Sequence, residues 1–234
     1  KLVRKKILNI KPYVSFRDQN RLEDAVFLDA NENPFGSYNR YPDSTQRDLK
    51  AKLADLKKID ANQISIGNGS DELIDVIIRT FCEPKQDSIL VMKPSFSMYR
   101  FYAEINENKV IETALDEDFQ INKDEFLQLI KENSPKIFFI CSPNNPTGKS
   151  IENIEYFLQN FTGIVVVDEA YIDFSGKDSA VKLLPKYQNL IVLQTFSKAW
   201  GMAAARVGAA YAFPEITQVI NKVKSPYNVS SLSL

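Results

Sequence analysis

Short apolar runs, rich in β-branched residues, alternate with helix-like stretches over most of this 234-residue chain. These runs are predicted strands, and they span residues 64–66, 88–92, 109–113, 136–141, 164–168, 190–194 and 207–212. The runs are continuously apolar, which is typical of strands covered on both faces. The alternation therefore predicts an α/β fold with a mostly parallel, seven-stranded sheet flanked by helices.

Four apolar stripes at helical spacing lie between these runs. They are formed by Leu49, Leu53 and Leu56; by Leu73, Ile74, Ile77, Ile78 and Phe81; by Phe126, Leu127 and Ile130; and by Ile154, Phe157 and Leu158. Spacings of three and four residues put each set on one face of a helix. We expect Ser44 or Asp43 to cap the first of these helices.

The first part of the chain does not follow this alternation. Residues 11–42 are rich in proline and asparagine, which favour turns and interrupt regular structure. We therefore expect an N-terminal arm and loop segment over residues 1–42, followed by one large domain over residues 43–234.

The composition excludes several classes of function. The chain has no histidine, which excludes Ser-His-Asp and Cys-His catalysis, His-ligated zinc and a histidine base within it. Its 29 basic and 30 acidic residues nearly cancel, so neither nucleic acid nor an anionic membrane is indicated as a partner. Cys82 and Cys141 form no CxxC pair and are expected to be buried thiols in a cytoplasmic protein. No run approaches the roughly 20 apolar residues of a membrane span.

Polar motifs follow the carboxyl ends of several predicted strands, where parallel sheets bind their ligands. The Gly-Asn-Gly-Ser turn at residues 67–70 opens a helix near Asp71, which could be an anion site or a plain tight turn. Residues 142–150 contain two prolines and a glycine, which fix a rigid loop. A side-chain amide in this loop could donate to a ligand or cap a helix.

Three charged residues also follow predicted strands. Asp168 ends a buried run, where a carboxylate needs a cation, a metal, a protonated heterocycle or an ion pair. Lys198 is expected to be partly desolvated by Phe196 and Trp200, which would lower its pKa and make it a usable nucleophile. Arg206 lies among alanines and needs an anion. Taken singly, each could be an ordinary ion-paired or surface residue.

Two interpretations compete for these motifs. A nucleotide-binding P-loop would use residues 148–150, but Pro143 stands where that motif needs a glycine. Pyridoxal phosphate needs an amine for its aldehyde, an anion site for its phosphate, a carboxylate for its pyridinium nitrogen and donors for its phenolate oxygen. The residues that supply these groups in turn are Lys198; Ser70 and Arg206; Asp168; and Asn145 with Tyr171.

The same motifs carry a resemblance to a known family over nearly the whole chain. The matching stretches are residues 28–34 (LDANENP), 39–42 (NRYP), 67–72 (GNGSDE), 94–99 (PSFSMY), 142–148, 165–174 and 195–208. In this order they resemble the fold-type I pyridoxal-phosphate-dependent aminotransferases, and the first two stretches resemble the histidinol-phosphate aminotransferases. The resemblance implies amino-group transfer from glutamate to imidazole-acetol phosphate, which gives histidinol phosphate in histidine biosynthesis.

The resemblance also implies roles for single residues. Lys198 would bind the cofactor's aldehyde and later move the substrate proton, while Asp168 would pair with the ring nitrogen. Tyr171 and Asn145 would bind the phenolate oxygen, and Phe96 would stack on the ring. The phosphate would be surrounded by Ser70, Asp71, Thr195, Ser197 and Arg206.

Further implied roles lie outside the strand ends. Tyr41 would reach the phosphate of the cofactor in a partner subunit, which implies a homodimer with shared active sites. Tyr13 and Asn33 would lie near the small-molecule substrate. Family members continue after residues 225–228 into a small C-terminal domain of roughly 100 residues, which supplies substrate-binding arginines. Since this chain stops at Leu234, we expect that domain to be absent from it.

Three interpretations of the activity stay open at this point. The first is a histidinol-phosphate aminotransferase. The second is another fold-type I enzyme, such as an aromatic aminotransferase or a phospho-amino-acid decarboxylase. The third is a truncated, cofactor-binding fragment without turnover.

Overall fold

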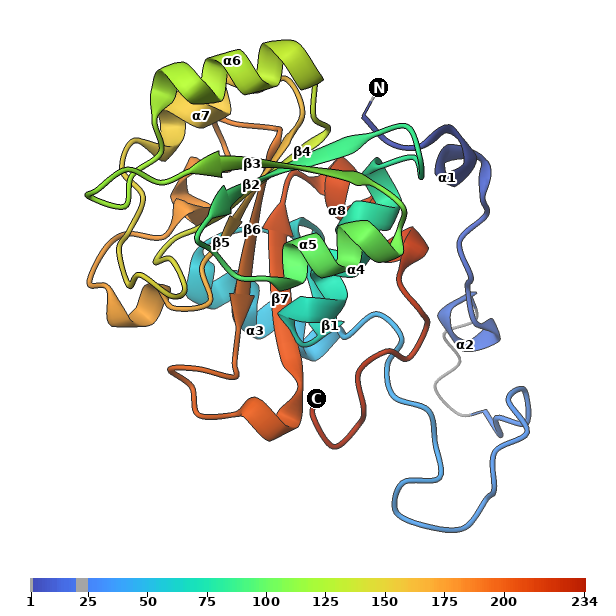
Figure 1. Cartoon of the computed structure of the whole chain (residues 1–234). Coiled ribbons are helices and arrows are strands. Elements are labelled where there is room, and N and C mark those ends of the chain that lie inside the picture. Colours follow the sequence, from blue (N-terminus) through green and yellow to red (C-terminus); the bar gives the residue numbers. More distant parts are fainter. Residues whose placement is uncertain (1, 20–24) are drawn as a thin grey trace.

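A computed structural model of the chain describes residues 2–19 and 25–234 (Figure 1). In this part of the chain seven strands form one sheet, in the order β1-β7-β6-β5-β4-β2-β3. Their bounds are Ile64–Asn68 (β1), Ser88–Lys93 (β2), Lys109–Ala114 (β3), Ile137–Cys141 (β4), Ile164–Asp168 (β5), Leu190–Thr195 (β6) and Val207–Ala212 (β7). The seven predicted strands are thus confirmed, and their ends move by two residues or fewer.

Most neighbouring strands run parallel, as predicted. β3, β2, β4, β5 and β6 form a series of parallel pairs. β7 is antiparallel to both of its neighbours, β6 and β1. The carboxyl ends of β1, β2, β4, β5 and β6 therefore meet the beginning of β7 at one edge of the sheet.

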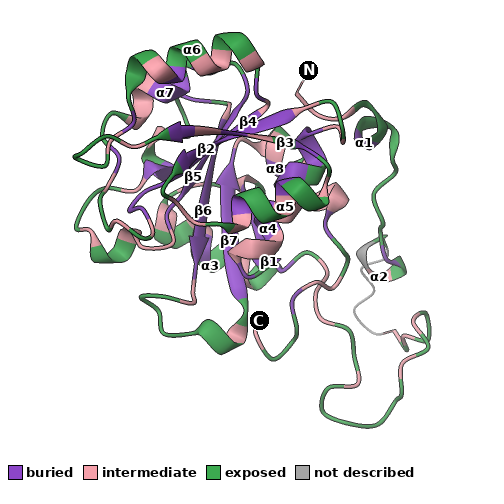
Figure 2. Cartoon of the chain, viewed as in Figure 1, coloured by how far each residue is buried: buried purple, intermediate pink, exposed green. Residues whose placement is uncertain are grey.

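The central strands form the buried core. Every residue of β4, β5, β6 and β7 is buried, and Figure 2 shows these strands within a shell of more exposed segments. β3 differs, since only Ile111 and Thr113 in it are buried. The prediction of full coverage is therefore wrong for β3, because helices cover this edge of the sheet incompletely. Cys82 and Cys141 are buried free thiols, as predicted.

Six longer helices pack around the sheet. They are α3 (Arg47–Lys57), α4 (Ser70–Phe81), α5 (Met98–Ile105), α6 (Lys123–Asn133), α7 (Ile154–Asn160) and α8 (Pro214–Val223). Short 3₁₀ segments are η1 (Ala61–Gln63), η2 (Ile172–Phe174), η3 (Ala180–Leu183) and η4 (Ala203–Ala205). Among the described residues, no helix has the length and apolar character needed to cross a membrane.

The structure confirms the predicted apolar stripe of one helix and contradicts single positions in two others. All five apolar residues of the α4 stripe are buried. In α3, Leu56 is 55% exposed, so the predicted stripe is wrong at that position. Leu127 of α6 is likewise exposed. Asp43 accepts a hydrogen bond from the N–H of Arg47 (2.9 Å), as expected of a capping group, although Gln46 stands at the cap position.

The N-terminal segment lies largely outside the body of the sheet and helices (Figure 1). Its described part contains two short helices, α1 (Lys5–Asn9) and α2 (Phe16–Gln19). Val26, Leu28 and Phe35 each expose more than four fifths of their surface. The described part of the segment thus leaves much of its apolar surface exposed. The proposed division into an arm and a large domain stays a prediction.

Glu32 organises the loop that follows α2. Its carboxylate forms ion pairs with Arg17 and Arg40 and accepts a hydrogen bond from the N–H of Tyr41 (2.7 Å). The Arg17 guanidinium, against the opposing effect of burial, holds the pKa of Glu32 at about 2. The loop is therefore fixed by charges rather than by an apolar core.

Candidate active site

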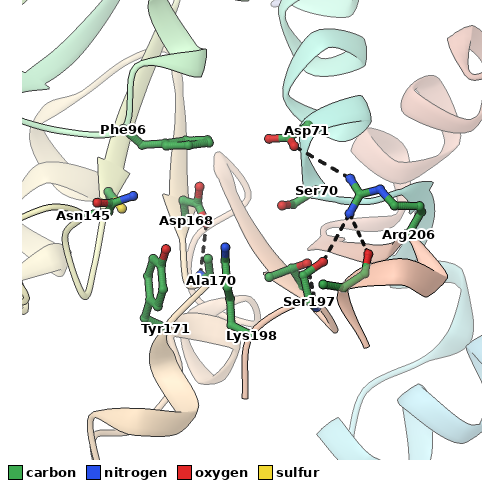
Figure 3. Close-up of a pocket in the computed structure, with 13 residues that line it drawn as sticks. Ser70, Asp71, Phe96, Asn145, Asp168, Ala170, Tyr171, Ser197, Lys198 and Arg206 are labelled. Atoms are coloured by element: carbon green, nitrogen blue, oxygen red, sulfur yellow. Dashed lines mark hydrogen bonds and ion pairs between the residues drawn. The ribbon is translucent and has the colours of Figure 1, made fainter. Parts of the chain in front are cut away.

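A cavity of about 210 Å³ lies at the sheet edge where the strand ends meet (Figure 3). It is lined by most of the predicted site residues, namely Ser70, Asp71, Phe96, Asn145, Asp168, Tyr171, Thr195, Ser197, Lys198 and Arg206. These residues come from the turns after β1, β2, β4, β5 and β6 and from the start of β7. The structure thus brings the motifs at the strand ends together around one cavity.

The beginning of α4 forms one end of the cavity. Ser70 and Asp71 lie in the first turn of this helix, where backbone N–H groups have no partner within the helix. Arg206 points toward the same place, with Nη2 3.9 Å from Asp71 Oδ2 and Nη1 donating to Ser197 Oγ (3.4 Å). The guanidinium and the positive end of the helix dipole together favour an anion here.

Two glycines permit this close approach. A Cβ added at Gly69 would lie 2.5 Å from Arg206 Nη2, and one added at Gly208 would lie 2.4 Å from Ser70 N. Gly69 also has a φ of 81°, which favours glycine. Arg206 and β7 can therefore lie directly against the start of α4.

Lys198 projects into the cavity from the connection between β6 and β7 (Figure 3). Its Nζ lies 5.6 Å from the centroid of the Tyr171 ring. Lys198 is exposed and Trp200 is 51% exposed, so the expected desolvation of the lysine is wrong for this structure. The reason is that this connection extends beyond the sheet (Figure 1), where the rings of Trp200 and Phe196 lie against each other at 5.4 Å.

Asp168 forms the buried base of the cavity at the end of β5. Its Oδ2 accepts a hydrogen bond from the Tyr99 hydroxyl (2.7 Å), and its Oδ1 accepts one from the N–H of Ala170 (3.1 Å). Burial raises the pKa of Asp168, while these two hydrogen bonds and the charge of Lys198 act in the opposite direction. A cationic group in the cavity would stabilise its ionised form further.

Asn145, Tyr171 and Phe96 line the remaining walls (Figure 3). The adjacent Asn144 is buried, and its Nδ2 donates to the carbonyl of Pro94 (3.0 Å). It thereby links the turn after β4 to the turn that carries Phe96. Of the two neighbouring asparagines, one fixes the wall and the other contributes to the cavity surface.

Sequence reasoning missed several residues of the site. Cys141, Ala170 and Ala203 also line the cavity, and Tyr99 contacts Asp168 from behind its wall. The signal for Cys141 was its position at the end of a predicted strand. The signal for Tyr99 was its spacing three residues after Phe96, at the start of an unpredicted helix.

Three predicted site residues do not line this cavity. The Tyr41 ring stacks on Tyr227 at a centroid distance of 4.6 Å, and Tyr13 meets the same ring edge-on at 6.5 Å. Asn33 Oδ1 accepts a hydrogen bond from the N–H of Phe35 (2.9 Å). Because the implied role of Tyr41 requires a second copy of the chain, it stays a prediction, as do the roles of Tyr13 and Asn33.

Comparison with known proteins assigns the sequence to a family. Residues 14–234 match the profile described as aminotransferase class I and II. The chain is 50% identical over 239 aligned positions to the histidinol-phosphate aminotransferase of Cytophaga hutchinsonii. That alignment covers 99% of this chain and 68% of the relative.

Solved structures share the fold. The histidinol-phosphate aminotransferase of Clostridium acetobutylicum superposes with a TM-score of 0.74 at 27% identity, over 84% of this chain and 59% of that one. The histidinol-phosphate aminotransferase of Sinorhizobium meliloti, solved in complex with pyridoxal-5'-phosphate, gives a TM-score of 0.77 at 24% identity. The superposition covers 87% of this chain and 60% of that one. The chain thus spans roughly three fifths of these solved chains.

Proposed function

Because this chain belongs to the aminotransferase class I and II family, we propose that it forms the cofactor-binding part of a histidinol-phosphate aminotransferase. Family membership confirms the resemblance derived from the motifs. The proposed reaction transfers an amino group between histidinol phosphate and 2-oxoglutarate, with pyridoxal phosphate as cofactor. The observation that carries the proposal is that Lys198, the buried Asp168, and Arg206 with the start of α4 line one cavity.

The residues of the cavity fit this cofactor. Its dianionic phosphate matches the end formed by Arg206 and the start of α4, where Gly69 and Gly208 leave room that a Cβ would fill. Its protonated ring nitrogen matches Asp168, a buried carboxylate that lines the cavity. Its aldehyde matches Lys198, whose amine is accessible.

Bound pyridoxal phosphate supplies an aldehyde that condenses with amines and a ring that withdraws electrons from the attached carbon. In the proposed mechanism Lys198 would hold the cofactor. It would also carry a proton between the substrate carbon that bears the amino group and the carbon of the cofactor's former aldehyde. Asp168 would hold the ring nitrogen in its protonated form, and Tyr171 and Asn145 would orient the ring by donating to its phenolate oxygen.

The other residues bind and cover the cofactor in this proposal. Arg206 and Ser197, with Ser70 and the N–H groups at the start of α4, bind the phosphate. Phe96 covers one face of the ring and excludes water from it. The division of labour follows the geometry, with the phosphate at one end of the cavity and Asp168 at its base.

The first experiment mixes the protein with pyridoxal phosphate, records the visible spectrum, reduces the sample with borohydride and maps the modified residue by mass spectrometry. We expect an absorption band and a covalent adduct on Lys198. Both should be lost in Lys198→Ala and retained in Lys149→Ala, which removes an exposed lysine from the loop after β4. An adduct on another lysine, or a band that survives Lys198→Ala, would contradict the proposal.

Transamination measured with histidinol phosphate and 2-oxoglutarate tests the substrate. Turnover by the 234-residue chain supports the full reaction. Cofactor binding without turnover supports a fragment that binds the cofactor only. Release of carbon dioxide from a phosphorylated amino acid would instead indicate a decarboxylase. We further propose a cytoplasmic homodimer, which cell fractionation and sedimentation of the purified protein test.

A further inference from the structure

Tyr99 lies behind the cavity wall and contacts two of its functional groups. It belongs to the first turn of α5 and is 1% exposed. Its hydroxyl donates a hydrogen bond of 2.7 Å to Asp168 Oδ2. Its ring meets the Phe96 ring edge-on, with 5.6 Å between the centroids. One side chain therefore touches both the carboxylate at the base of the cavity and the aromatic ring in its wall.

The surroundings of Tyr99 leave it little freedom to move. Its ring stacks on Phe139 of β4 at a centroid distance of 4.7 Å and an interplanar angle of 12°. Phe139 is itself fully buried. Since a close-packed interior resists rotation of a large ring, the direction of the Tyr99 hydroxyl is set by the core of the sheet and not by solvent.

The charged and titratable groups around this hydrogen bond come from several elements. They are Asp168 at the end of β5, Cys141 at the end of β4, Asp71 in α4 and Lys198 after β6. Burial raises the pKa of Tyr99 well above its ordinary value, and it raises the pKa of Cys141 to about 12. Both groups therefore keep their protons at neutral pH, and Tyr99 acts only as a donor toward the carboxylate.

We propose that Tyr99 is a positioning residue that keeps Asp168 ionised and oriented toward the cavity while supporting Phe96. The N–H of Ala170 donates to the other oxygen of this carboxylate, Oδ1 (3.1 Å). Removal of the Tyr99 hydroxyl therefore takes away the hydrogen bond that Oδ2 accepts in this buried site. The proposal rests on the proposed function only for the identity of the group that Asp168 binds in the cavity. The effect on Asp168 itself exists in the protein without cofactor.

The main test uses Tyr99→Phe, which keeps the ring and removes the hydroxyl. Carbon-13 NMR of protein labelled at aspartate carboxyls, without cofactor, follows the titration of Asp168, whose signal is assigned by its loss in Asp168→Asn. A hydrogen bond to the ionised form favours that form, so we expect the proton affinity of Asp168 to rise about tenfold in the variant. An unchanged titration would overturn the proposal.

Tyr211→Phe is the matched control. Tyr211 is also 1% exposed but lies in β7, and it does not line the cavity. The variant therefore reports the effect of removing a buried phenol hydroxyl at a position outside the cavity wall. The titration of Asp168 should be the same in this variant as in the original protein.

A double-mutant cycle keeps the inference testable if the labelled variant is poorly folded. The free energy of unfolding in urea is measured for the original protein, Tyr99→Phe, Asp168→Asn and the double variant. We expect the two substitutions to be non-additive, because Tyr99→Phe removes the donor of this hydrogen bond and Asp168→Asn removes the negative charge of its acceptor. Additive effects would assign Tyr99 a packing role only and would reject the proposal.

A measurement with pyridoxal phosphate separates this proposal from the proposed function. Tyr99→Phe should weaken equilibrium binding of the cofactor about tenfold and shift the pH dependence of its absorption. If the original protein forms no adduct at Lys198, the proposed function fails, while the result for Asp168 in the free protein still decides the role of Tyr99.

Discussion

Single positions determine the shape of the end of the cavity that Arg206 and the start of α4 form. A Cβ at Gly208 would lie 2.4 Å from Ser70 N and 2.6 Å from Gly69 C, and both of these are backbone atoms. A backbone cannot rotate aside as a flexible side chain can. Any larger residue at this position must therefore separate β7 from the start of α4, whose first two residues line the cavity.

Gly208→Ala should destabilise the protein by about 1–3 kcal/mol, in the range of overpacked interior positions. It should also weaken binding of pyridoxal phosphate, because the helix start moves away from Arg206. Urea unfolding and equilibrium dialysis measure the two effects. Ala210→Gly, in the same buried strand, should lower stability and leave binding intact. Unaltered binding by Gly208→Ala would contradict the role given to the contact.

At the scale of helices and strands, the kind of residue that an element buries decides whether the sequence predicts it. The strands were recognisable because buried parallel strands are continuous apolar runs. α5 and α8 were missed because their buried faces contain small or hydroxyl-bearing residues, Tyr99 and Ala103 in α5 and Thr217 beside Ile220 in α8. Such a face is harder to recognise from apolar spacing than the apolar stripe of α4.

α3 and α4 provide a direct comparison of a wrong and a confirmed stripe. Ile77 of α4 is fully buried, whereas Leu56 of α3 is 55% exposed. Ile77→Ala should cost about 2–5 kcal/mol through lost burial and the cavity left behind. Leu56→Ala should change the free energy of unfolding in urea by less than about 0.5 kcal/mol. Equal costs would mean that Leu56 is covered in solution.

The arm is the element whose order should depend on acid pH. The pKa of Glu32 is held at about 2, below its ordinary 4.5, mainly by the Arg17 guanidinium. A carboxyl with a lowered pKa stabilises the folded loop above the ordinary value and loses that contribution as pH falls toward the lowered one. We therefore expect the arm to stay ordered at neutral pH and to loosen between about pH 4.5 and 2.

The NMR shift of the Tyr41 amide proton, which Glu32 accepts, reports this change. In Glu32→Gln the shift of this proton should have, at every pH, the value that it takes in the original protein at acid pH. Glu104→Gln is the control, since Glu104 is an exposed glutamate that pairs with Arg100 within α5. A midpoint at the ordinary glutamate value would show that the ion pairs are not formed in solution.

The candidate site was predictable where it depends on strand ends and not where it depends on packing between other elements. Lys198, Asp168 and Arg206 follow or precede strands, and parallel topology brings such positions to one edge. Tyr99 was missed because its role comes from a packing contact across two elements. Tyr13 and Tyr41 lie in the arm, whose position no periodicity of the sequence fixes.

At the scale of the whole molecule, the exposed side chains of the arm bear on the proposed dimer. Val26, Leu28 and Phe35 expose large apolar surfaces that a second copy could cover. Tyr41→Phe keeps the ring contact with Tyr227 but removes the hydroxyl proposed to reach the partner's phosphate.

We expect Tyr41→Phe to weaken pyridoxal phosphate binding about tenfold at protein concentrations where sedimentation finds dimers. The control is Tyr38→Phe, at a tyrosine of the same loop that is 71% exposed. Equal affinities of Tyr41→Phe and the original protein for pyridoxal phosphate would show that the Tyr41 hydroxyl does not bind the cofactor.

The reversed direction of β7 places Lys198 and Arg206 of the cavity on one connection. Because the chain leaves the sheet at the end of β6 and returns as β7, one connection carries both Lys198 and Arg206. The span between the amine and the guanidinium is therefore bounded by this connection, and not only by the packing of separate elements. An analogue of the proposed cofactor with a longer spacer between its aldehyde and its phosphate would need a longer connection here, while the rest of the sheet could stay as it is.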